Sequence, residues 1–371
     1  MARLLWADSG HDIARAEFRL DNGPILLPMP VTRSLQSPKI ESEPGLLRVT
    51  GPTFELNFDT IQGMISKWKY KSVHMLQCSP DLTFYRALTD NDKPGQSGDW
   101  KGHRLDAMTH SIRQFSHHMN NETGILEVKV ETWIAPPVLP WGFATTTTYK
   151  IHSDGKLLIH VRASPKGPAP GTVARAGLEM TLPEDRIHAQ WFGRGPGQSY
   201  RDMKDAEKIG VWKRSVDQMM HIYEMPQENG NRTDTRWVKI TDERGIGLKA
   251  VLQRGSVADT TKPESPDNKN STKQSSEIPS SPLDNWTMEP PPYEQDSNRE
   301  GFDFCLSRFT TAELEEAEHP HELKTGKYIL FRIDDDHHGL GSASCGPDTL
   351  EQHQLKMREF DFTVSLEPTG I

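Results

Sequence analysis

The densest group of residues suited to molecular recognition lies between Trp191 and Trp237. Aromatic side chains such as Tyr200 and Trp212 alternate there with glycine, proline and amide residues, and the run PQENG at 226–230 repeats the mixture. Glycine permits positive φ, proline fixes a turn, and the aromatic and amide groups offer flat apolar faces and hydrogen bonds. This composition disfavours helix and regular strand. It predicts either a loop surface suited to sugars or to another domain, or a rigid connector packed on a β-sheet.

A second polar segment, Leu82 to Pro94 (LTFYRALTDNDKP), carries Arg86, Asp90, Asn91 and Asp92. An arginine close to carboxylates predicts an internal salt bridge, and Asp or Asn in a turn predicts an Asx-type hydrogen bond. The residues themselves therefore indicate a loop that is held in shape from within.

Other side chains that could bind a metal or act as thiols give weaker signals. The run DDDHH at 334–338 offers oxygen and imidazole groups, but such neighbours on a turn more often form a solvated corner, so we expect no metal there. The three cysteines, Cys78, Cys305 and Cys345, are too widely spaced to predict a disulfide framework or a zinc site.

The elements that must position these segments are predominantly strands. Apolar and polar residues alternate over 54–59 and again over 126–134, which is the period of a strand with one buried face. Asp154-Gly155 and Glu243-Arg244-Gly245 each separate two such runs and predict hairpins. One short helix is expected after Thr310, where Thr310 and Glu313 form a capping-box pattern. The chain is therefore predicted to be all-β, with a large antiparallel sandwich.

Composition and charge narrow the class of protein. The chain has 371 residues and a net charge of −9, which argues against nucleic acid or an anionic membrane surface as its main partner. It contains no apolar run of about 18 residues, and its N-terminus lacks the apolar core of a signal peptide, so we expect a soluble, cytoplasmic protein. Residues 256–298 are rich in Ser, Pro, Asn and Asp and predict a disordered surface insertion.

Four blocks of the sequence occur along the chain in the same order as in a known family. They resemble the C-terminal domain of glycoside hydrolase family 2 β-galactosidases, the group of the bacterial lac enzyme and its fungal relatives. They are WFGRGPGQSYRDMKDAEKIGVW followed by PQENGNRTDTRW, LTFYRALTDNDKPG, GFDFCLSRFTTAEL and HHGLGSASCGPDTL. The resemblance implies a supersandwich of the galactose-mutarotase type over 46–371, lying beside a catalytic barrel. It also implies that residues 1–20 are a remnant of the preceding immunoglobulin-like domain and that 21–45 form a linker.

The resemblance also assigns a place to two loops. Residues 82–94 match the family's mobile loop at the mouth of the galactoside pocket, which implies direct substrate contact as the alternative role of the four polar residues named above. Tyr85 and Leu88 stand where the usual family form has Trp and Pro, and these departures predict a less rigid loop. In the loop 339–347, Cys345 is the nearest match to the position at which the bacterial lac enzyme has a tryptophan that stacks on the second sugar. A cysteine cannot stack on a sugar ring, so we expect a shallower aglycone subsite.

Retaining hydrolysis requires two carboxyl groups about 5–5.5 Å apart, and the family places both on a (β/α)₈ barrel that this sequence does not contain. We therefore assign no catalytic residue, metal or cofactor to this chain and expect the family's magnesium and sodium ions in the barrel. The resemblance implies a β-galactosidase region that acts on terminal non-reducing β-D-galactose, with the barrel supplied by another chain or a missing segment. The intact enzyme is expected to be oligomeric.

Two alternatives from other classes remain at this point. One is a non-catalytic module that binds galactosides or serves assembly. The other is a mutarotase-like epimerase, which requires a histidine and a glutamate that face each other on a concave sheet; His160 and His188 are present, but no spacing singles them out.

Overall fold

The structure, a computed structural model, describes residues 37–252 and 301–370. The expected immunoglobulin-like remnant at 1–20 and the expected insertion at 256–298 lie outside the described residues. Part of the expected linker is also outside, but its end is not a linker. Residues Lys39–Glu43 form strand β1, which pairs with β2 in an antiparallel hairpin closed by Gly45 at φ 81°.

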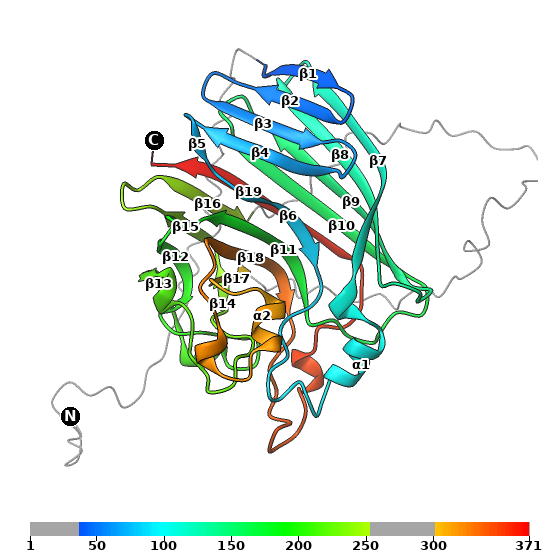
Figure 1. Cartoon of the computed structure of the whole chain (residues 1–371), viewed down its shortest axis with the longest axis vertical. Coiled ribbons are helices and arrows are strands. Elements are labelled where there is room, and N and C mark those ends of the chain that lie inside the picture. The colour runs from blue at the N-terminus through cyan, green and yellow to red at the C-terminus, as the bar shows by residue number, and fades with distance from the viewer. Residues whose placement is uncertain (1–36, 253–300, 371) are drawn as a thin grey trace, which may run out of the picture. The chain divides into compact units, whose positions relative to one another are not determined.

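The described residues form three antiparallel sheets (Figure 1). In order across each sheet, the first has β1 (Lys39–Glu43), β2 (Leu46–Thr50), β3 (Phe54–Asp59), β4 (Met64–Tyr70) and β5 (Val73–His74); the second has β13 (Lys208–Ser215), β12 (His188–Gly195), β15 (Trp237–Thr241), β16 (Gly247–Leu252), β19 (Phe360–Thr369), β10 (Leu157–Lys166), β9 (Gly142–Ile151), β8 (Ile125–Ala135) and β7 (Thr109–Asn120); the third has β14 (Arg232–Thr235), β17 (Phe302–Ser307), β18 (Tyr328–His337), β11 (Arg175–Pro183) and β6 (Cys78–Thr83). The expectation of an all-β chain with a large antiparallel sandwich is confirmed.

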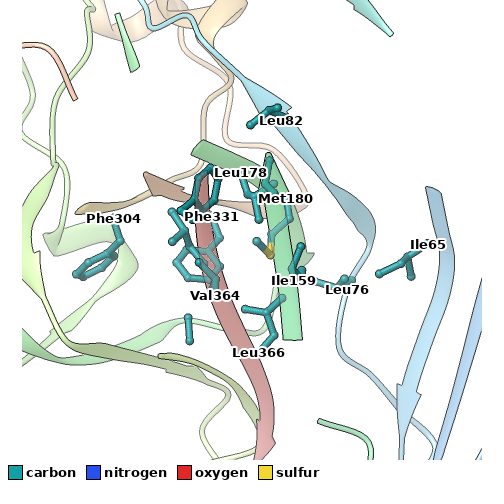
Figure 2. Packing of buried hydrophobic residues seen from close by; sticks show 14 of the residues in the cluster. Ile65, Leu76, Leu82, Ile159, Leu178, Met180, Phe304, Phe331, Val364 and Leu366 are labelled. Carbon is teal, nitrogen blue, oxygen red and sulfur yellow. The ribbon is translucent and has the colours of Figure 1, made fainter. Parts of the chain in front are cut away.

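The main core lies between the nine-stranded sheet and the sheet that contains β11 and β18. Figure 2 shows Leu178 and Met180 of β11 and Phe331 of β18 beside Ile159 of β10 and Val364 of β19. These residues belong to one continuous cluster of buried apolar side chains. Burying a side chain of this size contributes about 1.5–3 kcal/mol, so the facing sheets are stabilised by many such contacts.

The first sheet packs on the nine-stranded sheet through aromatic side chains. The Phe58 ring on β3 lies 6.1 Å from the Phe115 ring and 5.3 Å from the Tyr149 ring, both at edge-on angles. Ile65 on β4 donates its backbone N–H to the Ser79 hydroxyl of β6 at 3.1 Å, which ties the first sheet to the third.

The predicted turns and the predicted helix are present. Gly155 and Gly245 adopt φ of 86° and 83° in the β9–β10 and β15–β16 hairpins, as the Asp-Gly and Arg-Gly signals indicate. Helix α2 (Thr311–Glu316) begins after Thr310, whose hydroxyl and backbone exchange hydrogen bonds with Glu313. A second short helix, α1 (Ser97–Gly102), follows the polar loop at 84–96. In the part of the chain that the structure describes, no helix has the length and apolar character needed to span a membrane.

Candidate functional site

Arg86 is the centre of the first loop, and its guanidinium is completely buried. Its Nε and Nη2 donate to the two carboxylate oxygens of Asp92 at 3.1 and 2.7 Å. Its Nη1 donates to the His338 carbonyl at 2.7 Å, and Nη2 donates to the Gly339 carbonyl at 3.0 Å. The indole of Trp100 on α1 lies 5.4 Å from the guanidinium carbon. A planar fork of donors that is satisfied in this way fixes the loop to the end of β18.

Asp92 receives the ion pair and also closes the turn. Its carboxylate accepts from the Thr89 backbone N–H at 2.9 Å, and the Thr89 hydroxyl accepts from the Asp92 N–H at 3.1 Å. The side chains of Arg86 and Asp92 are 0% and 1% exposed, so in this chain they hold the loop from inside and present no surface to a ligand. This is the internal salt bridge and side-chain turn that the sequence predicts.

The departures at Tyr85 and Leu88 are compensated from helix α2. The Tyr85 hydroxyl donates to Glu315 Oε1 at 2.6 Å, and the Leu88 backbone N–H donates to the same oxygen at 3.3 Å. Burial, followed by the hydrogen bond to Glu315, raises the pKa of Tyr85. The tyrosine therefore stays a neutral donor, and Glu315 ties both Tyr85 and Leu88 to helix α2.

Asp90 is the part of this loop that reaches solvent. Its side chain is 53% exposed, and Lys93 Nζ donates to Oδ1 at 3.0 Å. The amide of Gln227, in the PQENG turn, donates to Oδ2 at 3.0 Å. The hydrogen bonds from Lys93 and Gln227 lower the pKa of Asp90, so its carboxylate remains ionised near neutral pH.

Asn91 joins the first loop to the second loop, residues 338–349 (Figure 1). Its Nδ2 donates to the Gly341 carbonyl at 2.8 Å, and its Oδ1 accepts from the hydroxyl and backbone N–H of Ser344 at 2.6 and 3.2 Å. Gly341 in turn donates its N–H to Asp202 at 2.7 Å. Cys345, one residue beyond Ser344, is exposed. Asp90, Asn91 and Cys345 therefore lie on two loops that are hydrogen-bonded into a single rim, which we define as residues 89–93 and 341–347.

The residues 334–338 do not form a solvated corner, and that expectation was wrong. Residues 334–337 are the end of strand β18 and His338 follows it, and Asp334, His337 and His338 are 1%, 1% and 0% exposed. Arg175 on the neighbouring strand β11 donates to Asp334 through Nε at 2.8 Å, and its Nη2 lies 2.6 Å from the same oxygen. The acids of this run are thus neutralised by arginines distant in sequence. Among the described residues, no group of three or more His, Cys, Asp and Glu side chains is placed to hold a metal ion.

The stretch from Trp191 to Trp237 is only partly the loop that its composition predicts. Trp191 lies on β12 and is fully buried, with its ring 5.7 Å from Phe304 and the Arg232 guanidinium 5.6 Å above it. Strands β12 and β13 form a regular antiparallel pair across 188–195 and 208–215. Glycine is needed at Gly193 because a Cβ there would collide with Thr235 of β14, which packs closely against β12. The PQENG turn is the part that remains irregular.

The two histidines considered for epimerase chemistry are far apart. His160 lies on β10 and His188 on β12, and three strands separate them in the sheet. At about 4.8 Å per strand the separation is roughly 19 Å. His160 Nε2 contacts Asp361 Oδ1 at 2.8 Å, and His188 is exposed. The two histidines therefore do not share a site, and His160 pairs with an aspartate and not with the glutamate that the epimerase alternative requires.

The site also contains residues that sequence reasoning missed. Gln227 contacts Asp90, Glu228 contacts Arg332 at 3.3 Å, and Asp202 holds Gly341. The PQENG run predicts a turn, but nothing local in it indicates which distant loop the glutamine contacts.

The solved structures that resemble this chain include distant sugar epimerases. A galactose mutarotase related enzyme from Lactobacillus acidophilus aligns with a TM-score of 0.40 and 7% identity, over 90% of this chain and 97% of that one. A galactose 1-epimerase from Lactobacillus acidophilus NCFM aligns with a TM-score of 0.38 and 8% identity, over 87% and 94%.

Similarity in sequence is more extensive. The β-galactosidase of Kluyveromyces lactis is 28% identical over 362 residues, which cover 96% of this chain and 30% of that enzyme. The β-galactosidase of Priestia megaterium is 28% identical over 247 residues, which cover 66% of this chain and 23% of that enzyme. The chain thus spans less than a third of the length of these relatives. Residues 50–366 match the family model of the β-galactosidase small chain. This chain belongs to the β-galactosidase small-chain family.

Proposed function

We propose that this chain forms one wall of a β-galactosidase active site, whose catalytic carboxylates come from a barrel on another chain or on a further segment. The observation that carries the proposal is the small-chain match over 50–366, which includes both loops of the rim. The hydrogen bonds of Asn91 to Gly341 and Ser344 support it, because they present the two loops as one surface.

The proposal gives the rim residues different roles. Asp90 and Asn91 face the substrate side and orient a galactoside by hydrogen bonds, whereas Arg86 and Asp92 hold the loop in place from inside. The catalytic pair, and the magnesium and sodium ions of the family, belong to the partner region. The carboxylates at 334 and 336 do not suit a metal, because Arg175, Arg201 and Arg358 already contact them.

Reconstitution tests this function. The chain is mixed with a β-galactosidase piece that ends before the region matched here, and hydrolysis of a chromogenic β-galactoside is followed. We expect turnover in the mixture and none from the chain alone, because the missing carboxylate pair is needed for a rate enhancement of at least about 10⁶-fold. In the active mixture, Asp90→Ala should lower turnover.

Two outcomes would contradict the proposal. If no catalytic piece is activated, the chain is better explained as a galactoside-binding or assembly module. If the chain alone turns over substrate and a single Glu→Gln change within it abolishes this activity, the catalytic group lies here.

Cys345 provides a separate prediction about specificity. It is exposed on the rim and offers no flat face for a second sugar. Cys345→Trp should lower KM for a disaccharide more than for an aryl galactoside, because an indole stacks on a pyranose ring. Cys345→Ser is the matched control and should leave the ratio of the two KM values unchanged. Equal effects of the Trp substitution on both substrates would contradict the assignment of this loop to the aglycone side.

A further inference from the structure

Asp90 and Gln227 form a reciprocal pair across 137 positions of sequence. The Asp90 backbone N–H donates to Gln227 Oε1 at 3.0 Å, and Gln227 Nε2 donates back to Asp90 Oδ2 at 3.0 Å. The Gln227 amide therefore forms hydrogen bonds with both the main chain and the side chain of Asp90. Two hydrogen bonds from one planar group restrict position and rotation together, which a single contact does not.

The two members of the pair differ in exposure. Gln227 is 7% exposed, whereas half of the Asp90 side chain faces solvent. Lys93 Nζ donates to the other carboxylate oxygen at 3.0 Å and also lies 2.9 Å from Met225 Sδ, in the residues just before the PQENG turn. Lys93 and Gln227 therefore each hold one oxygen of the carboxylate, while the side chain as a whole remains about half exposed to solvent.

The PQENG turn is a rigid support for this contact. Asn229 donates through Nδ2 to the Gln227 carbonyl at 2.9 Å, and Gly230, at φ 80°, donates its N–H to Gln198 at 3.0 Å. Between Gln227 and Asn229, Glu228 is 3% exposed and paired with Arg332. Gln227 thus belongs to a turn that is anchored on both sides, and Asp90 takes its orientation from it.

We infer that Gln227 is a positioning residue that sets the direction of the Asp90 carboxylate, so that this carboxylate can accept hydrogen bonds from the hydroxyl groups of a sugar. The inference rests on the proposed function for the identity of the ligand, but the contact itself can be tested without any activity. Pre-orienting an acceptor removes the entropy cost of ordering it when the ligand binds. The loss of Gln227 therefore weakens recognition without removing a group that touches the substrate.

The first test uses the chain alone and two properties of Asp90. Carboxyl carbon shifts measured by NMR against pH give its pKa, and hydrogen exchange gives the protection of its backbone N–H. In Gln227→Met we expect the Asp90 pKa to rise and its N–H to exchange several-fold faster, because one donor and one acceptor are lost. Gln227→Glu keeps the acceptor but brings two carboxylates together, so the Asp90 pKa should rise further while the N–H stays protected.

Controls separate this contact from a general loosening of the rim. Gln96→Met removes a different amide, just outside the rim, which donates to Asp348 at 2.9 Å, and it should leave the Asp90 pKa unchanged. The exchanged pair Asp90→Asn with Gln227→Glu places the side-chain donor at 90 and the acceptor at 227, and it should keep the N–H at 90 as protected as in the wild type. If Gln227→Met or Gln227→Glu leaves both properties of Asp90 at their wild-type values, the inference is wrong.

The second test uses the reconstituted enzyme. Gln227→Met should raise KM for a β-galactoside several-fold with a smaller effect on kcat, and Gln96→Met should change neither as much. If the Gln227 variants change Asp90 as expected but no mixture is active, the proposed function is wrong while the contact between Gln227 and Asp90 stands. An altered Asp90 with unchanged KM in an active mixture would instead overturn the positioning role.

Discussion

At the scale of single residues, the polar side chains that first suggest a binding site are largely internal supports. Arg86, Arg175, Arg232 and Arg332 are all buried. Three of them contact carboxylates, while Arg232 donates to four backbone carbonyls, including those of Gly230 at 2.7 Å and Pro196 at 3.1 Å. Burial lowers the pKa of Arg232 to about 10, and the residue still carries its charge at neutral pH. Buried arginines of this kind specify the conformation of the loops around them.

The Arg86–Asp92 pair should be costly to break. Arg86→Met leaves a buried carboxylate without its partner, and we expect the free energy of unfolding to fall by roughly 3–5 kcal/mol in urea titrations. Arg162→Ala is the matched control, since it breaks an ion pair with Glu359 whose side chains are 60% and 42% exposed. That change should cost less than about 1 kcal/mol. Equal costs for the two variants would show that the buried pair does not hold the loop.

His338 predicts how stability depends on pH. Its Nδ1 accepts from the Leu355 N–H at 3.0 Å, and burial, with Arg86 nearby, lowers its pKa to about 3. An unfolded histidine titrates near 6.5. Between about pH 6.5 and pH 3 the unfolded state therefore binds a proton that the folded state does not, and stability falls as pH is lowered through this window.

The expected slope is about 1.4 kcal/mol per pH unit for each such histidine, and the burial of His337 acts in the same direction. His338→Asn keeps an acceptor for Leu355 but cannot be protonated. Its stability at pH 7 should be lower, because the buried ring is lost, yet the decline from pH 6.5 to 5 should be shallower than in the wild type by up to about 1.4 kcal/mol per pH unit. Parallel pH curves for the two proteins would contradict a neutral, buried His338.

At the scale of elements, the pairing of β11 with β18 is irregular at Gly177, a position that only glycine can fill. The pairing shifts between Ala176 and Gly177, and a Cβ at Gly177 would collide with Asp334 and with the Ile333 carbonyl. Asp334 is the partner of Arg175, so any displacement there also disturbs a buried ion pair.

Gly177→Ala should therefore destabilise the chain by roughly 2–3 kcal/mol, measured as a lower urea midpoint, since the added methyl group overpacks a buried strand. Gly171→Ala is the control, because nothing lies within 4 Å of a Cβ at that position. That variant should be neutral or slightly stabilising. A neutral Gly177→Ala would mean that the strands can separate at the bulge without cost.

The same elements show what the sequence can and cannot predict. Alternation over 54–59 and 126–134 correctly predicts β3 and β8, and the Asp-Gly and capping-box signals correctly predict a hairpin and helix α2, because these are local patterns. The strands β12 and the end of β18 are missed because their charged and glycine residues mask the alternation. Asp334 is satisfied by an arginine 159 positions away. No local pattern reveals a partner at that separation, and the contact of Gln227 with Asp90 is hidden for the same reason.

At the scale of the molecule, all three sheets contribute to one continuous apolar cluster. The first sheet buries its apolar face by packing on the nine-stranded sheet, where Phe58 contacts Phe115 and Tyr149. The rim, in turn, depends on two strands of the third sheet and on the loops that follow them, since Arg86 follows β6 and its acceptors follow β18. The rim therefore keeps its geometry only while the third sheet stays folded. The shared apolar cluster predicts that the three sheets unfold together.

Phe58→Ala tests that cooperativity. Phe58 is fully buried, and the loss of its ring should cost roughly 3–5 kcal/mol. If the sheets form one unit, hydrogen exchange should accelerate both in peptides from β2–β4 and in peptides from β8–β9, because opening one sheet exposes the other. Phe58→Leu gives a milder form of the same change should the alanine variant fail to fold. Ile61→Ala, at a 71% exposed position in the following turn, should accelerate neither region. Faster exchange confined to the first sheet would show that it unfolds on its own, and the rim would then be expected to survive its loss.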